Sequence, residues 1–347
     1  MSRYFLDQID RMAGYAPGEQ PRDGGFVKLN TNENPYPPSP RVARAIAGAL
    51  DDRLRLYPDP VGTAFREAAA TLHGVEPGMI LAGNGSDDLL TILTRAFVGP
   101  GDAMAYPTPS YILYKTLAEI QGARAVEVPF EPDWTLDPAR FARTGARLAL
   151  VANPNSPSGT ALPPDQLGAI AEGLDCPLVV DEAYVDFAEG DAIGLVAKHP
   201  NVIVLRTLSK GYSLAGLRLG YLVAWPAMVQ GLIKVKDSYN CDTLSLAGGV
   251  AALGDRGHLA ETRAKILATR ARLIGAMKGL GYRVPESRAN FAWCTDGPPA
   301  PEVYEALKAR KILVRLMRYP GRDPGLRITV GTDGEIDRLL DALGSVG

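Results

Sequence analysis

One lysine stands in a setting that suits nucleophilic chemistry. Lys210 follows the apolar run 202–205 and lies within the stretch TLSKGYSLAGLR. A lysine near the buried edge of a sheet has a lowered pKa, so its amine can act as a nucleophile. Small neighbours leave room for a flat cofactor, and Thr207, Ser209 and Arg218 can bind a phosphate group on it. A solvated lysine in a glycine-rich loop is the alternative interpretation.

The elements that would position this lysine are short apolar runs that alternate with amphipathic stretches. Runs at 147–152, 177–180 and 202–205 each end in polar residues, and the pattern between the first two predicts a helix over 165–174. Such alternation is typical of βαβ units around a buried parallel sheet. In an open α/β sheet, ligands bind at the carboxyl ends of the strands. We therefore expect a site where these three runs end.

The pattern changes along the chain and predicts three parts: an irregular N-terminal arm over 1–40, a large domain over 41–245 and a small α+β domain over 246–347 that packs with the arm. The remaining expected elements are helices at 65–72, 88–97, 111–121, 258–280 and 335–343, and strands at 79–82, 103–106, 291–294, 312–315 and 326–330. The basic face over 263–278 is interpreted as a solvated helix surface.

A second polar stretch, GNGSDD, begins at Gly83 and immediately precedes an expected helix. The free backbone amides at the start of a helix favour a phosphate group, here near Gly85, Ser86 and Asp87. The stretch lacks the third glycine of a dinucleotide fingerprint, because Asp88 stands in its place. A nicotinamide-dependent dehydrogenase is therefore disfavoured.

Composition excludes several classes of partner. The formal net charge is -2, from 37 basic and 39 acidic residues, so we expect no nucleic-acid or membrane binding. Three widely spaced cysteines predict neither a disulfide framework nor a cysteine zinc site, and three isolated histidines predict no metal site. With no signal pattern and no apolar run of about 20 residues, a cytoplasmic protein is expected.

Four ordered stretches together resemble the class I and II aminotransferases, which depend on pyridoxal 5'-phosphate (PLP). They are GNGSDD at 83–88, NPNSPSG at 153–159, DEAY at 181–184, and the lysine stretch at 207–218. The resemblance implies an α/β fold of type I. It comprises a large domain with a mainly parallel seven-stranded sheet sandwiched by helices, and a smaller α+β domain.

The resemblance also implies how PLP is held. Lys210 would carry the cofactor as a Schiff base and, once freed by the amino donor, act as general base at its α-carbon. Asp181 would keep the pyridine nitrogen protonated, while Tyr184 and Asn153 would hydrogen-bond the phenolic oxygen. The phosphate would be bound by Gly85, Ser86, Asp87, Thr207, Ser209 and Arg218.

Two tyrosines are assigned by the same resemblance. Tyr111 would stack on the cofactor ring, although Tyr106 and Tyr114 are near it in the sequence and packing is the alternative. Tyr57 would reach the cofactor phosphate of a neighbouring subunit. The implied enzyme is therefore a homodimer with a shared active site.

Within that family, the chain is most similar to the histidinol-phosphate aminotransferase group. The supporting stretches are GYAPG at 14–18, LNTNENP at 29–35, KDSYN at 236–240 and GLRITVG at 325–331. By this resemblance Arg315 and Arg327 would bind the substrate phosphate, helped by Tyr15 and Asn32. The expected reaction converts L-histidinol phosphate and 2-oxoglutarate to imidazole acetol phosphate and glutamate, in histidine biosynthesis.

Three alternatives remain open at this point. The first is an aromatic or other amino-acid aminotransferase, since the counterpart of Arg327 in those enzymes binds an α-carboxylate. The second is a lyase resembling threonine-phosphate decarboxylase, which would release carbon dioxide and need no keto acid. The third is a regulatory PLP-binding protein, for which the 347 residues leave no room for an added domain.

Overall fold

The computed structural model describes residues 4–14, 17–21 and 24–344. Its largest feature is a seven-stranded sheet with the order β2-β8-β7-β6-β5-β3-β4, in which β8 alone runs antiparallel to its two neighbours. The strands are β2 Ile80–Gly83, β3 Ala103–Thr108, β4 Arg124–Pro129, β5 Leu148–Ala152, β6 Leu178–Asp181, β7 Val202–Thr207 and β8 Gly220–Val223. The expected α/β fold with a mainly parallel seven-stranded sheet is confirmed.

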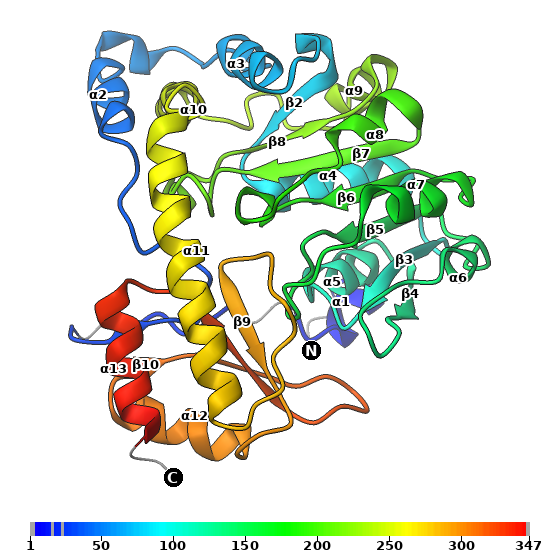
Figure 1. The fold of residues 1–347 in the computed structure, drawn as a ribbon. Coiled ribbons are helices and arrows are strands. Elements are labelled where there is room, and N and C mark those ends of the chain that lie inside the picture. Colours follow the sequence, from blue (N-terminus) through cyan, green and yellow to red (C-terminus); the bar gives the residue numbers. More distant parts are fainter. Residues whose placement is uncertain (1–3, 15–16, 22–23, 345–347) are drawn as a thin grey trace.

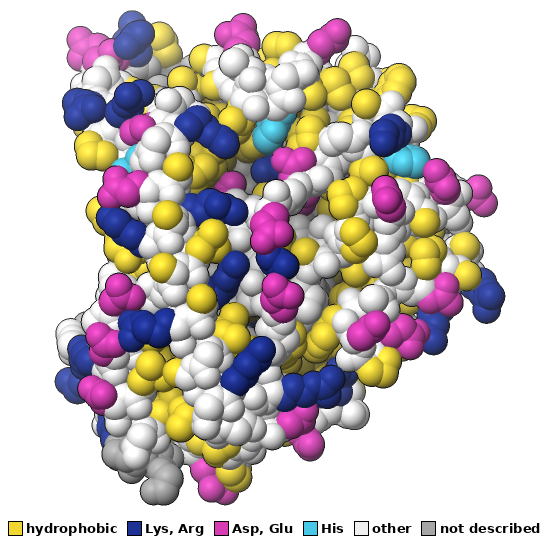
Figure 2. All heavy atoms as spheres, in the orientation of Figure 1, with side chains coloured by type: hydrophobic (Ala, Val, Ile, Leu, Met, Phe, Trp, Pro, Cys, Tyr) yellow, Lys and Arg dark blue, Asp and Glu magenta, His cyan; other side chains and the backbone are white. Residues whose placement is uncertain are grey.

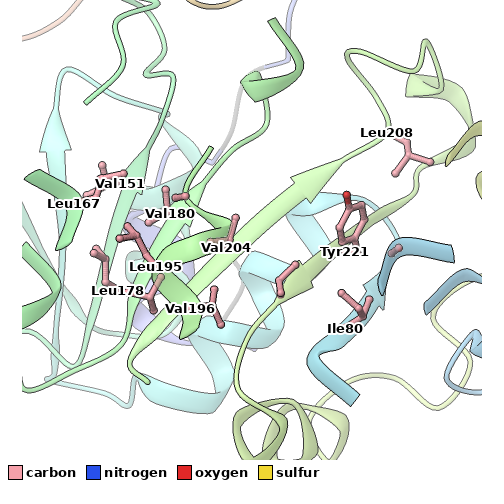
Figure 3. Packing of buried hydrophobic residues seen from close by; sticks show 14 of the residues in the cluster. Ile80, Val151, Leu167, Leu178, Val180, Leu195, Val196, Val204, Leu208 and Tyr221 are labelled. Atoms are coloured by element: carbon pink, nitrogen blue, oxygen red, sulfur yellow. The ribbon is translucent and has the colours of Figure 1, made fainter. Parts of the chain in front are cut away.

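Helices cover both faces of this sheet (Figure 1). One face packs against α3 Thr63–His73, α6 Pro138–Ala142, α7 Pro164–Glu172, α8 Ile193–Lys198 and α10 Thr243–Leu253. The other packs against α4 Ser86–Phe97, α5 Leu113–Ile120 and α9 Pro226–Ile233. Apolar strand side chains such as Val180 and Val204 fill the first interface (Figure 3). The sheet is buried on both sides, as its continuous apolar runs predict.

Alternation along β6 and β7 decides which polar side chains meet at the strand ends. Val180 and Val204 belong to one hydrophobic cluster, whereas Val179 and Ile203 belong to the cluster on the opposite face. Because successive residues point to opposite faces, Asp181 falls on the α5 side and Glu182 on the other. On that other face, Glu182 forms a buried ion pair with Arg206, with 2.7 Å between Oε2 and Nε.

A second region contains a three-stranded antiparallel sheet of β11 Arg315–Met317, β12 Gly325–Thr329 and β9 Phe291–Cys294. Its own hydrophobic cluster draws on α11 Arg256–Gly279, α12 Ala300–Ala309 and α13 Asp333–Gly344. The long helix α11 runs beside both regions (Figure 1). The expected boundary between residues 245 and 246 falls inside α10, which packs against α2 Pro40–Gly48 and α3.

Two sequence interpretations need correction. The arm is not wholly irregular, because it contains α1 Asp7–Arg11 and β1 Val27–Lys28. Strand β1 pairs in parallel with β10 Ile312–Leu313, which ties the arm to the second region. The single strand expected over 312–315 is in fact two short strands, since Val314 separates β10 from β11 and the two belong to different sheets.

The basic face of α11 is a further correction, because its arginines are not merely solvated. Arg263 donates two hydrogen bonds of 2.7 Å to the carbonyl oxygens of Asp186 and Ala188. Arg270 donates to the carbonyl oxygens of Phe187 and Ala289. Guanidinium groups that serve backbone acceptors in this way fix α11 against the loop that follows β6. A helical pattern shows where such side chains lie but not which acceptors they meet.

The surface in view carries basic and acidic side chains interspersed with apolar ones (Figure 2). Within the described ranges, no helix is long and apolar enough to cross a membrane. The same part of the chain contains no group of three or more His, Cys, Asp or Glu residues arranged to hold a metal ion.

Candidate active site

A cleft opens where β5, β6 and β7 end and the second region faces them. Its lining brings together most of the side chains singled out in the sequence: Ser86, Asp87, Tyr111, Asp181, Tyr184, Thr207, Ser209, Lys210, Arg218, Arg315 and Arg327. Asn32 and Asn153 are not among the lining residues. The predicted position of the site, at the carboxyl ends of parallel strands, agrees with this arrangement. Tyr15 lies outside the described residues.

Lys210 is the amine at the centre of this cleft. Its Nζ donates a hydrogen bond of 3.1 Å to the Thr31 carbonyl oxygen and lies 5.8 Å from the centroid of the Tyr184 ring. Burial, together with the nearby charge of Arg327, lowers the pKa of Lys210 to about 8. A lysine in this state has a substantial neutral fraction near neutral pH and can attack a carbonyl carbon.

Asp181 is a buried carboxylate that suits a cationic ring nitrogen. Its oxygens accept hydrogen bonds from the Tyr114 hydroxyl at 2.7 Å and from the Ala183 amide at 3.1 Å. Burial raises the pKa of Asp181 to about 6, against the lowering effect of these two bonds. No basic side chain in the described part of the chain forms an ion pair with it. A protonated pyridine nitrogen would supply the missing positive charge.

Tyr184 and Asn153, both predicted to contact the cofactor's phenolic oxygen, lie in different surroundings. The Tyr184 hydroxyl lies at the cleft and accepts a hydrogen bond of 3.0 Å from the Asn32 side chain. Asn153 is buried and its amide group is paired with both backbone groups of Leu162, at 2.7 and 3.2 Å. Asn153 itself is not among the residues that line the cleft, although its neighbours Ala152 and Pro154 are.

A phosphate cradle lies at the start of α4. Gly85 has a φ of +85°, a conformation that glycine adopts without strain, and α4 begins at the next residue. The Asn84 amide donates to the Asp88 carboxylate at 2.8 Å, which fixes the first turn. Ser86 and Asp87 of this turn line the cleft, and the first amides of a helix have no partners within it.

Arg218 completes the cradle from the other side. Its backbone is left-handed, with a φ of +50°, and its Nη1 donates to the Ser209 hydroxyl at 3.3 Å. A Cβ atom at Gly85 would stand only 2.6 Å from Arg218 Nη2, and the φ of +85° would strain any other residue, so glycine is favoured at that position. Amides, hydroxyls and a guanidinium converge here, and this donor set fits the phosphate of PLP.

The two other tyrosines occupy different places. Tyr111 lines the cleft, meets Tyr114 edge to face at 5.6 Å between ring centroids, and donates to Asp87 at 3.3 Å. Tyr57 is 81% exposed and stacks on Tyr239 at 4.5 Å. It is absent from the cleft lining of its own chain, so a role at a cofactor requires a second subunit.

Arg315 and Arg327 face each other directly across the β11–β12 ladder. Arg327 donates to the Ser156 hydroxyl at 3.0 Å and to the Asn30 carbonyl oxygen at 3.1 Å. Within the described residues its buried Nε has no hydrogen-bond partner. Arg315 donates to the Pro17 carbonyl oxygen at 3.3 Å. Two guanidinium groups at one end of the cleft form a site for an anion with two negative charges.

Several contributors were not assigned from sequence. Tyr114 was noted only as a neighbour of Tyr111, yet it donates directly to Asp181. Ser156 and Asn30 hold Arg327, and Thr31 holds Lys210. Three of these residues, Asn30, Thr31 and Ser156, lie in the motifs at 29–35 and 153–159. The motifs therefore indicated the segments that reach the site, but not which residues contact each other.

Comparison with known proteins places this geometry in context. The model of the family described as aminotransferase class I and II matches residues 25–343. A histidinol-phosphate aminotransferase of Rhodopirellula baltica is 50% identical over 341 residues, which cover 97% of this chain and 94% of the relative. Histidinol-phosphate aminotransferase 1 of a Nostoc species is 46% identical over 346 residues, which cover 99% and 98%.

A solved structure shows the same fold. The histidinol-phosphate aminotransferase from Sinorhizobium meliloti, in complex with pyridoxal 5'-phosphate, superimposes with a TM-score of 0.90. The two sequences are 29% identical, and the match covers 100% of this chain and 98% of that one. The likeness therefore extends over both regions of the molecule and both sides of the cleft.

Proposed function

The chain belongs to the class I and II aminotransferase family, and from this premise we propose that it transfers the amino group of L-histidinol phosphate to 2-oxoglutarate. The products would be imidazole acetol phosphate and glutamate, a step of histidine biosynthesis. The observation that carries the proposal is the pair Arg315 and Arg327, which face each other at the end of the cleft that holds Lys210. Relatives that carry the same activity in their names, at 46 to 50% identity, support it.

The enzyme depends on pyridoxal phosphate, and the cradle described above would hold the cofactor's phosphate. We assign the covalent attachment to Lys210 Nζ, the pyridine nitrogen to Asp181, and the phenolic oxygen to Tyr184 and Asn153. When bound, PLP supplies an electron-withdrawing ring that stabilises negative charge at the α-carbon of the amino donor.

The chain's own part in the reaction is to move protons and fix orientations. Lys210 Nζ, once free, would take the proton from the α-carbon of the amino donor and would return it on the cofactor side. Its pKa of about 8 allows both directions near neutral pH. Asp181, held by Tyr114, keeps the proton on the ring nitrogen.

Substrate selection falls to the two opposed arginines. Arg327 is already oriented by Ser156 and Asn30, and its free Nε leaves it one more donor for an incoming anion. A phosphate dianion can accept from both guanidinium groups at once. The same pair would bind the γ-carboxylate or α-carboxylate of 2-oxoglutarate in the second half of the reaction.

A second copy of the chain would complete the site. Tyr57 is highly exposed beside other exposed apolar side chains, Leu50, Leu54 and Leu56. Covering such a group is favourable, and a homodimer in which Tyr57 reaches the partner's cofactor phosphate would do so.

The test is turnover by the PLP-loaded protein with L-histidinol phosphate and 2-oxoglutarate, measured as glutamate formed. L-Histidinol is the matched control, since it lacks only the phosphate. Borohydride reduction followed by peptide mass spectrometry identifies the lysine that carries the cofactor. We expect saturable turnover, a strong preference for the phosphorylated donor, and the tag on Lys210. Equal rates with both donors would contradict the assigned donor.

A further inference from the structure

The loop Asn30–Asn34, here called the arm loop, contacts Lys210 from outside the large sheet. The carbonyl oxygen of Thr31 accepts the hydrogen bond of 3.1 Å from Lys210 Nζ. The amide group of Asn34 donates to the carbonyl oxygens of Lys210 and Gly211, at 3.2 and 3.0 Å. The arm loop therefore binds both the side-chain end and the backbone of the lysine.

The arm loop is itself fixed to the second region. Asn32 has a φ of +57°, and asparagine is one of the few residues that tolerate this conformation. Its backbone amide donates to Thr329 Oγ1 and its carbonyl oxygen accepts from Asn290, both at 3.0 Å. On the other side of Thr31, Arg327 donates a hydrogen bond to the carbonyl oxygen of Asn30. With bonds on both sides of it, the Thr31 carbonyl has a defined position.

An ion pair contacts the side chain of the same residue, Thr31. Lys28 and Glu33 form a close ion pair, and the Thr31 hydroxyl joins it by accepting from Lys28 at 2.8 Å and donating to Glu33 at 2.7 Å. The two side chains are 24% and 40% exposed, respectively. Burial opposes ionisation of Glu33, but the bonds from Lys28 and Thr31 outweigh it and lower the pKa of Glu33.

Charges from several elements act on Lys210. Arg327 on β12 and Arg218 lower its pKa, in addition to burial, whereas Glu33 on the arm loop and Asp87 on α4 raise it. The Tyr184 ring also faces the amine. Of these groups, Arg327, Arg218, Asp87 and Tyr184 lie at the proposed substrate and cofactor positions. Glu33, which is paired with Lys28, is the contribution that lies outside them.

We propose that the arm loop is a positioning element for the Lys210 amine: the Thr31 carbonyl fixes where the free amine rests, and the Lys28–Glu33 pair beside this carbonyl modifies the basicity of the amine. The inference rests on the proposed function, in which Lys210 alternates between cofactor-bound and free. A general base must be free, correctly placed and of suitable pKa at each turnover. The arm loop supplies the placement through an acceptor that takes part in no covalent step.

The two members of the pair give opposite predictions. Glu33→Gln removes the negative charge and leaves Lys28 unneutralised, so the pKa of Lys210 should fall by about half a unit. Lys28→Met removes the positive charge and leaves Glu33 unneutralised, so the pKa of Lys210 should rise by about as much. The double variant should return close to the wild-type value. A purely structural role would change all three variants in the same direction.

The measurement is the pH dependence of Lys210 acylation by acetic anhydride in the full-length, cofactor-free protein, quantified by peptide mass spectrometry. Glu261→Gln is the matched control, because it breaks the exposed Lys265–Glu261 pair of α11. It should leave the pKa of Lys210 unchanged. The pH profile of turnover should shift in the same sense as the labelling midpoint in each variant.

The outcomes separate the two proposals. Opposite shifts for Glu33→Gln and Lys28→Met, cancelling in the double variant, support the arm loop as positioning element. Shifts in one direction, or none, overturn it even where the wild-type protein turns over L-histidinol phosphate. A borohydride tag found on a lysine other than Lys210 would instead refute the proposed function on which the inference rests.

Discussion

The two ends of the cleft are built differently. At the cofactor end, Asp181 and Thr207 close neighbouring strands of one buried sheet, and Lys210 and Arg218 follow in the same connection. At the anion end, Arg327 meets Asn30 and Ser156, which lie far from it in the sequence. The cofactor end is thus set by one sheet, whereas the anion end depends on how three separate segments assemble. Under the proposed function, we therefore expect substitutions at the cofactor end to change the rate of reaction and those at the anion end to change the choice of substrate.

The largest expected effect is at the cofactor end. Lys210→Ala removes the amine to which we assign cofactor attachment and transfer of the α-proton, so turnover should fall by at least about 10⁴-fold. The cradle remains, so the variant should still bind PLP without covalent attachment. Steady-state glutamate formation measures the first effect and the mass after borohydride reduction the second. Turnover within tenfold of wild type would refute the role of this lysine.

Arg327→Gln should act mainly at the anion end. Losing a charge-assisted contact with a phosphate costs about 3 kcal/mol, which is about 10²-fold in kcat/KM for L-histidinol phosphate. The kcat/KM for L-histidinol should fall much less, and PLP binding should be unchanged. Arg322→Gln is the control, because that guanidinium packs over the Trp134 ring. Equal losses for the two donors would show that the anion end does not select the phosphate.

Tyr114→Phe sharpens the comparison within the cofactor end. It removes the hydroxyl that donates to Asp181 and leaves the ring packing intact. Because hydrogen bonds to charged groups contribute about 1.5 to 3 kcal/mol, kcat should fall by about tenfold. Tyr106→Phe is the matched control, since its hydroxyl meets Glu127 instead. A change in KM for the amino donor without a change in kcat would contradict this role of Tyr114.

The smallest effect concerns stability and pH. The pKa of Lys210 is lowered from 10.5 to about 8 in the cofactor-free fold, while the unfolded chain keeps its proton up to about 10.5. The unfolded state therefore binds more protons in this window, so the native state gains stability as pH rises from 8 to 10.5. Chemical unfolding of the wild type, compared with Lys210→Met over this range, should show that gain. A difference independent of pH would contradict it.

The sequence indicated which side chains would meet at the cofactor end, and the reason is physical. Polar residues at strand ends stand beside the apolar runs that position them, as with Asp181 after 177–180. The phosphate cradle is likewise local, since Gly85 immediately precedes α4. Strands β4 and β8 were not predicted: β4 carries exposed and half-buried residues, and β8 follows the lysine loop without a turn signal.

The anion end and the arm could not be predicted in the same detail. Nothing in the sequence indicates that the Thr31 carbonyl meets Lys210, because the contact joins residues 179 positions apart. Two-residue strands such as β1 and β10 have too few positions to show periodicity, so the arm was interpreted as irregular. The hydrogen bonds from Arg263 and Arg270 to backbone carbonyl oxygens were not predicted either, because they depend on tertiary contacts rather than on a local sequence pattern.

The most direct measurement is a single half-reaction. The PLP-loaded protein is mixed with L-histidinol phosphate in the absence of any keto acid, and the visible absorption band of the bound cofactor is followed. Glutamate, phenylalanine and threonine phosphate serve as comparators. We predict that L-histidinol phosphate converts the cofactor to its pyridoxamine form at the lowest concentration of the four. Conversion by glutamate and phenylalanine but not by L-histidinol phosphate would leave the family intact and contradict the proposed amino donor.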